Sequence, residues 1–106
     1  MENTEFPIDF HSDLEGPNSA YYGEVEHRIR ALARGHTDVT GAAVSLEKPV
    51  QGRETSPLFE ASVVVYLRPA NVAAVEKADG PLTALQGALD AVERQVREQR
   101  DKLRGH

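Results

Sequence analysis

Apolar and polar residues alternate in three segments of the chain, residues 6–10, 38–47 and 58–67, and this pattern predicts three β-strands. A turn at residues 68–71 follows the third of these, and residues 72–77 are predicted to continue as a fourth, short strand. A period of two residues is typical of a strand that buries one face and exposes the other. Because proline cannot donate a hydrogen bond to a neighbouring strand, Pro7 predicts that the first strand lies at a sheet edge or begins late.

Two further segments place apolar residues three and four positions apart, which is the spacing of a helix with one buried side. The first covers residues 19–34 and stops at Gly35, and the second covers residues 81–104 with Pro81 as its first residue. Gln99 is the one polar interruption in the apolar stripe of the second helix. That stripe consists of Leu82, Leu85, Leu89, Val92, Val96 and Leu103. We expect it to pack on the sheet as core, which is commoner than a coiled-coil seam.

The order of these elements predicts an α+β fold with a two-layer β-α-β-β-β-α arrangement, in which two helices pack on one face of a four-stranded sheet. Residues 6–106 would form this single domain, and residues 1–5 a disordered acidic leader. The last helix should span roughly 35 Å, whereas four strands side by side span about 15–20 Å. We therefore expect this helix to overhang the sheet unless it runs nearly parallel to the strands.

The composition excludes several classes of chemistry. The chain contains no cysteine, so it has no disulfide bond, thiolate nucleophile or cysteine-ligated zinc. No apolar run approaches the roughly 20 residues of a membrane helix. The acidic start of the sequence also lacks the basic and apolar regions of a signal peptide. We therefore expect a cytoplasmic protein without a membrane segment.

The formal net charge of -5 argues at first against nucleic acid, because phosphate binding needs a basic surface. The distribution of charge along the chain changes this interpretation. Residues 1–16 contain five acidic residues and no lysine or arginine, so residues 17–106 contain twelve acidic and twelve basic residues. Binding to nucleic acid would then depend on the local clustering of cations.

Five short stretches of the sequence, taken in their order and spacing, resemble those of a known protein family. Three of them lie in or at the end of the last predicted helix: residues 85–90 (Leu-Gln-Gly-Ala-Leu-Asp), 92–96 (Val-Glu-Arg-Gln-Val) and 101–106 (Asp-Lys-Leu-Arg-Gly-His). The others are residues 18–20 (Asn-Ser-Ala), where the first helix opens, and residues 58–63 (Leu-Phe-Glu-Ala-Ser-Val) in the third strand. In this order and spacing they resemble the ribosome hibernation-promoting and ribosome-associated-inhibitor family of bacteria (sigma-54 modulation protein, S30EA-like), in its short form.

This resemblance implies a non-enzymatic protein that occupies the mRNA and tRNA channel of the small ribosomal subunit in slow growth and silences translation. It also implies contact with ribosomal RNA, and it implies no cofactor, no small-molecule substrate and no membrane. The family is basic where this chain has Ala91 and Glu98. The basic residues expected at the RNA are Arg28 and Arg30 on the first helix and Arg94, Arg97, Arg100, Lys102 and Arg104 on the last.

A simpler interpretation of the basic residues on the last helix is a solvent-exposed face stabilised by ion pairs. An acid four residues before a base stabilises a helix by roughly a few tenths of a kcal/mol. Three such pairs are available: Asp90–Arg94, Glu93–Arg97 and Glu98–Lys102. Arg100 and Arg104 have no acid four residues earlier, so they are the strongest candidates for contact with RNA.

Nothing in the sequence indicates catalysis. His11, Ser12 and Asp13 are the residue types of a hydrolase triad, but adjacent residues do not converge their side chains as a triad requires. No two histidines are spaced four residues apart on one helix, which argues against a zinc site. Glycine-rich phosphate loops are also absent.

One face of the sheet is predicted to carry apolar side chains although no helix covers it. Alternation places Val64 and Tyr66 on this open face, and Val75 joins them subject to the register of the strands. The open face of an antiparallel sheet is usually polar, so these residues indicate a surface for contact with a protein. The alternative function is therefore a diverged family member without rRNA affinity that binds a protein partner, or itself, through this face. Salt-sensitive ribosome binding would distinguish the two functions.

Overall fold

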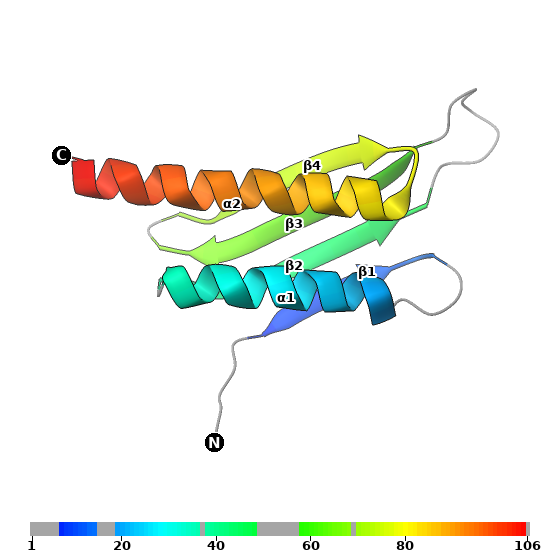
Figure 1. Cartoon of the computed structure of the whole chain (residues 1–106), viewed down its shortest axis with the longest axis horizontal. Helices are drawn as coiled ribbons and strands as arrows, with labels where there is room; N and C mark the ends of the chain where they lie inside the picture. The colour runs from blue at the N-terminus through cyan, green and yellow to red at the C-terminus, as the bar shows by residue number, and fades with distance from the viewer. Residues whose placement is uncertain (1–6, 15–18, 37, 49–57, 69, 106) are drawn as a thin grey trace, which may run out of the picture.

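The computed structural model describes residues 7–14, 19–36, 38–48, 58–68 and 70–105, with side chains up to residue 102. The elements are β1 (Ile8–Ser12), α1 (Ser19–Gly35), β2 (Val39–Glu47), β3 (Phe59–Leu67), β4 (Val72–Ala78) and α2 (Pro81–Gly105) (Figure 1). The predicted β-α-β-β-β-α order is confirmed. Phe6 and the predicted leader lie outside the described residues.

The four strands form one mixed sheet in the order β1-β2-β3-β4. β1 runs parallel to β2, whereas the β2–β3 and β3–β4 pairs are antiparallel. A parallel pair needs a long crossover connection, which contains α1 in this chain. β1 begins after Pro7 and lies at the edge of the sheet, as the proline predicted. The Pro7 carbonyl still accepts a hydrogen bond of 3.1 Å from the Ala42 N–H.

Both helices cover the same face of the sheet, which confirms the two-layer arrangement (Figure 1). α1 contacts β2 and α2, while α2 contacts mainly β3 and β4. The rings of Phe10 and Tyr22 meet edge to face with their centroids 5.9 Å apart, which joins β1 to α1. The largest fully buried side chains are Val25, Ile29, Leu46, Val63, Val65, Leu85, Leu89, Val92 and Val96.

The buried stripe of α2 differs from the predicted one at its start. Leu82 was expected in the core, but 42% of its surface is exposed. The stripe uses Ala84 and Ala88 beside Leu85 and Leu89, so its centre is rotated away from Leu82. Small alanines suit this position because they let the helix approach the sheet closely. The side chain of Leu103, the other end of the predicted stripe, lies outside the described residues.

Two glutamines of α2 hydrogen-bond to the edge strand of the sheet. The Gln95 Nε2 donates to the Ala73 carbonyl at 2.9 Å, and the Gln99 Nε2 donates to the Ala70 carbonyl at 3.0 Å. These carbonyls lie in or just before β4, where an edge strand leaves backbone groups without a strand partner. Gln99, which interrupts the apolar stripe of α2, therefore keeps the helix in contact with the sheet layer through a hydrogen bond.

The C-terminal turns of α2 project beyond the sheet, past the connection between β3 and β4 (Figure 1). The predicted overhang is therefore confirmed. In its described residues, neither helix has an apolar stretch long enough to cross a membrane. The projecting turns carry side chains that the sheet does not bury, including the exposed Lys102.

The difference between Leu89 and Leu82 gives a test of the packing of α2. Leu89→Ala should lower the free energy of unfolding by about 2–5 kcal/mol, because it leaves a cavity at a fully buried site. Leu82→Ala removes the same atoms from a site that is 42% exposed, so it should cost less than about 1 kcal/mol. Urea unfolding followed by circular dichroism measures both changes. Equal losses would contradict the rotation of the helix described above.

Candidate nucleic-acid interface on the helix pair

Arg28 is the centre of an ion-pair cluster that joins the two helices. Its Nε donates to Glu93 Oε2 at 2.9 Å, and its other guanidinium nitrogens contact Asp90 on α2 and Glu24 on α1. The hydrogen bond that Arg28 donates to Glu93 is the largest cause that raises the pKa of Arg28 above its ordinary value, against an opposing effect of burial. Only 21% of the Arg28 side chain is exposed. Three carboxylates therefore neutralise this arginine and hold it in place.

Arg30, the second predicted contact on α1, is also paired. Its Nε and its terminal nitrogen both donate to Glu26 Oε2, at 3.2 and 3.1 Å. The two residues are four apart on α1, so this pair lies within one helix. The structure therefore provides a counter-ion for both basic residues that the sequence placed at the RNA from this helix.

Arg94 and Arg97 are exposed on α2 and form no ion pair within the described residues. The sequence predicted that Asp90 would pair with Arg94 and that Glu93 would pair with Arg97, and this prediction is wrong. Both carboxylates bind Arg28 of α1 instead. Asp90 and Glu93 are three residues apart and point toward the neighbouring helix, where one planar guanidinium reaches both.

The remaining candidates lie toward the C-terminal end of α2. Arg100 has no acid four residues earlier on α2, but its Nη1 lies 3.5 Å from Oδ1 of Asp38, just before β2. Lys102 is exposed, and the predicted pair with Glu98 does not form among the described side chains. The backbone of Arg104 belongs to α2, but its side chain lies outside the described part of the structure.

A hollow lies between the end of α1 and the outer side of α2. Its lining residues are His36, Arg94, Arg97, Glu98, Arg100 and Asp101. The Nδ1 atom of His36 is buried and has no hydrogen-bond partner among the described residues. Sequence reasoning considered this histidine only as a metal ligand, because its place beside three arginines depends on the packing of the two helices.

The charges of the helix pair are therefore divided along its length. Acidic residues of both helices neutralise Arg28 and Arg30 in the middle of α1. Toward the C-terminal ends of the helices, the cations without an ion pair among the described residues are Arg34, Arg94, Arg97 and Lys102. Arg34, in the last turn of α1, was missed by the sequence analysis. Glu98 and Asp101 are the unpaired acids beside them, so the balance at this end is positive.

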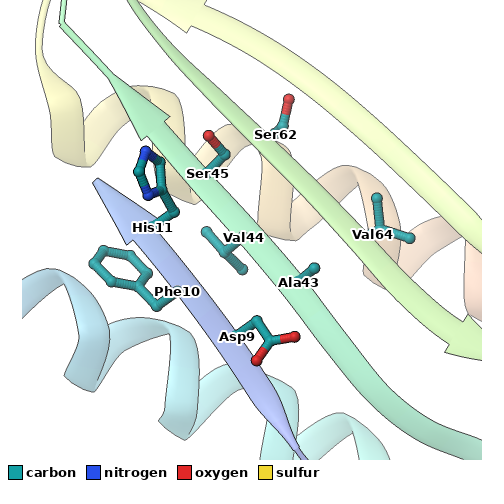
Figure 2. Close-up of a pocket in the computed structure, with 8 residues that line it drawn as sticks. All are labelled: Asp9, Phe10, His11, Ala43, Val44, Ser45, Ser62 and Val64. Carbon is teal, nitrogen blue, oxygen red and sulfur yellow. The ribbon is translucent and has the colours of Figure 1, made fainter. Parts of the chain in front are cut away.

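The opposite, open face of the sheet has a register that places Val75 beside the residues of β3 on this face. Val64 is the partner of Ala43 on β2 and of Ala73 on β4, and Val75 is the partner of Ser62. In Figure 2 the helices lie behind the strands, and Asp9, His11, Ser45 and Ser62 are drawn among the residues around a hollow on this face. Tyr66 and Val75 are 37% and 56% exposed. Contact of this face with a protein stays a prediction.

No three His, Asp or Glu side chains of the described residues gather as a metal site would require. The two candidate binding surfaces are therefore the cationic end of the helix pair, with Arg34, Arg94, Arg97 and Lys102, and the open face of the sheet.

Residues 18–104 match the family model described as sigma 54 modulation protein / S30EA ribosomal protein. No curated protein sequence matches the chain. Among solved structures, it is similar to a ribosomal subunit interface protein from Coxiella burnetii, with a TM-score of 0.71, 9% identity and coverage of 90% of this chain and 98% of that one. It is also similar to the N-terminal domain of Thermus thermophilus Protein Y, with a TM-score of 0.62, 20% identity and coverage of 88% and 94%. At these identities the likeness concerns the fold.

Replacement of Arg28 should destabilise the helix pair more than replacement of Arg30. Arg28→Ala leaves Asp90 and Glu93 unpaired beside each other and should lower the free energy of unfolding by about 1–3 kcal/mol, between the values for exposed and buried ion pairs. Arg30→Ala removes one pair within a helix and should cost about 0.5 kcal/mol or less. Urea unfolding at low and high salt measures both. Equal losses, or a loss for Arg28→Ala that salt does not reduce, would contradict the ion-pair cluster.

Proposed function

The chain belongs to the sigma 54 modulation protein / S30EA ribosomal protein family, and we propose that it is a ribosome hibernation factor that silences translation. In this proposal it binds the small ribosomal subunit through ribosomal RNA. The family match carries the proposal, because it extends over both helices and the whole of β2, β3 and β4. The family is named for a modulation protein and a ribosomal protein, and not for an enzyme.

The cations at the C-terminal end of the helix pair are the surface that we assign to the RNA. Arg94 and Arg97 are exposed and free of ion pairs within the described residues, so phosphate can replace water around them without breaking a protein contact. Arg100 must give up its 3.5 Å contact with Asp38 to do the same. Lys102 and Arg104 follow on the projecting turns of α2. We therefore rank Arg94 and Arg97 above Arg100.

Arg28 and Arg30 contribute less to binding in this proposal than their basic character predicts. A phosphate approaching Arg28 would meet three carboxylates that already bind it. The repulsion between phosphate and those carboxylates offsets the attraction of the arginine. Arg28 then supports the RNA-binding surface indirectly, by holding the two helices together.

The proposed partner places the protein in the cytoplasm, and silencing of translation is expected when growth slows. Sedimentation of a stationary-phase lysate, with detection of this protein across the ribosomal fractions, tests the proposed association with the small subunit. The protein should migrate with the small subunit at low salt and leave it as salt rises, because phosphate contacts release counterions. Its restriction to the soluble fraction at low salt, with intact ribosomes present, would contradict the hibernation proposal.

The RNA-binding residues can be tested through the salt dependence of binding to purified small subunits. Arg94→Ala/Arg97→Ala should reduce the slope of log affinity against log salt by about 1.5 units, from roughly 0.7–0.9 per phosphate contact. Arg100→Ala should have a smaller effect, since its pair with Asp38 competes with phosphate. Lys48→Ala/Lys77→Ala is the matched control, because it removes the same charge outside the helix pair.

If Arg94→Ala/Arg97→Ala changes neither the affinity for the small subunit nor its salt dependence, these arginines do not contact RNA. They are then part of a solvent-exposed helix face. The open sheet face, with Val64, Tyr66 and Val75, would then become the candidate surface for a protein partner or for self-association. A loss of equal size in the Lys48→Ala/Lys77→Ala control would indicate a general effect of net charge instead.

A further inference from the structure

The open face of the sheet contains a trough whose floor is made of uncharged side chains, with Asp9 and His11 at its side. Residues that are partners across the strands share this face, and they form two neighbouring rows. One row is Asp9, Ala43, Val64 and Ala73, and the next is His11, Ser45, Ser62 and Val75. A hollow of about 410 Å³ lies over the β1, β2 and β3 part of these rows (Figure 2). Its floor is made of small side chains, so a bound chain could approach the sheet closely.

The aromatic ring of Tyr66 extends the uncharged surface at one end. A Cβ atom at Gly41 would lie 3.3 Å from Tyr66 Cδ2 and 3.0 Å from the Pro7 carbonyl oxygen. The glycine therefore leaves room for the ring to lie close to the strand. Tyr66 remains 37% exposed, and Val75 56% exposed, on a face that no other described element covers.

The charges around the trough are mainly negative. Asp9 at β1 and Glu47 at the end of β2 are exposed, and neither has a hydrogen-bond or ion-pair partner among the described residues. The one lysine of this face, Lys77, already lies 3.9 Å from Glu60 on β3. His11 is also exposed and lies two residues after Asp9 on β1. This sheet face thus has the opposite sign from the cationic end of the helix pair.

We propose that the trough binds a basic, aliphatic segment of another polypeptide. A lysine or arginine of that segment would pair with Asp9, and its aliphatic side chains would cover Ala43 and Val64. The hydroxyls of Ser45 and Ser62 have no partner among the described residues, so they are available to backbone amides of the bound segment. Charge complementarity selects this occupant, because the free carboxylates repel acidic chains.

The same charges oppose the two other candidate occupants. RNA would bring phosphates to Asp9 and Glu47, and Lys77 on this face already lies near Glu60. A second copy packed face to face would bring two sets of these carboxylates into one interface. The proposal is independent of RNA binding by the helices, since it uses the other layer of the molecule.

Peptide titration of the ¹⁵N-labelled full chain, followed by NMR, tests the proposal. The probes are a short blocked peptide in which lysine alternates with valine, the same peptide with glutamate for lysine, and oligouridylate. The lysine peptide should shift the amide signals of Ala43, Ser45 and Ser62 and leave those of α2 unchanged. The glutamate peptide should bind at least about tenfold more weakly, from the summed effect of several exposed charge pairs.

Variants separate the role of Asp9 from net charge. Asp9→Asn should weaken binding of the lysine peptide roughly two- to fivefold, as expected for one exposed ion pair. The matched control is Asp79→Asn, which removes the same charge from the turn between β4 and α2 and should bind as the unaltered chain does. Val64→Lys should abolish binding by placing a cation on the floor of the trough. Thermal unfolding verifies that each variant is folded.

Several results would overturn the proposal. These are equal binding of the lysine and glutamate peptides, equal effects of Asp9→Asn and Asp79→Asn, or peptide-induced shifts confined to the helices. Shifts of the Ala43, Ser45 and Ser62 signals by oligouridylate, or by raised protein concentration alone, would assign the face to RNA or to a second copy. Arg94→Ala/Arg97→Ala should leave peptide binding unchanged, so a failure of this proposal is distinguishable from a failure of ribosome binding.

Discussion

The packing of α2 on β3 and β4 is the constraint on which both candidate surfaces depend. Leu85, Leu89, Val92 and Val96 are almost completely buried, so the helix can take only one rotation about its axis. That rotation turns Asp90 and Glu93 toward α1 and leaves Arg94 and Arg97 exposed to solvent. An α-helix has 3.6 residues per turn on average. The position of the buried stripe therefore determines which charged residues of α2 face α1 and which face solvent.

The elements could be predicted from the sequence because their main signal is local. Alternation in the strands and the three-and-four spacing in the helices reflect the face that each element buries, so the order and approximate bounds follow directly. Alternation also gave the face of each residue in β3, with Val63 buried and Val64 on the open face, whereas the register with β2 and β4 comes from the structure. The limit of this reasoning appears at Leu82, where neighbouring alanines change the centre of the stripe.

The ion pairs could not be predicted in the same way. The rule that acids and bases four residues apart pair along a helix considers one helix in isolation. Arg28 lies 62 and 65 positions from Asp90 and Glu93, and only the packing of α1 beside α2 brings them together. Its guanidinium binds both acids at once and only 21% of its side chain is exposed, so this arrangement competes well with two exposed pairs on α2. The same packing places His36 beside the arginines of α2.

The net charge of the chain does not describe its local distribution of charge, which is more relevant to the partners that each surface can bind. A value of -5 describes a protein that would avoid RNA, yet cations without ion pairs outnumber unpaired acids at the C-terminal end of the helix pair, within the described residues. The helix layer ends in arginines without ion pairs among the described residues, and the sheet layer presents unpaired Asp9 and Glu47 around an uncharged trough. In the two proposals made above, phosphate meets the helix layer and a basic polypeptide meets the sheet layer. Both proposals therefore depend on the local distribution of charge and not on the total charge of the chain.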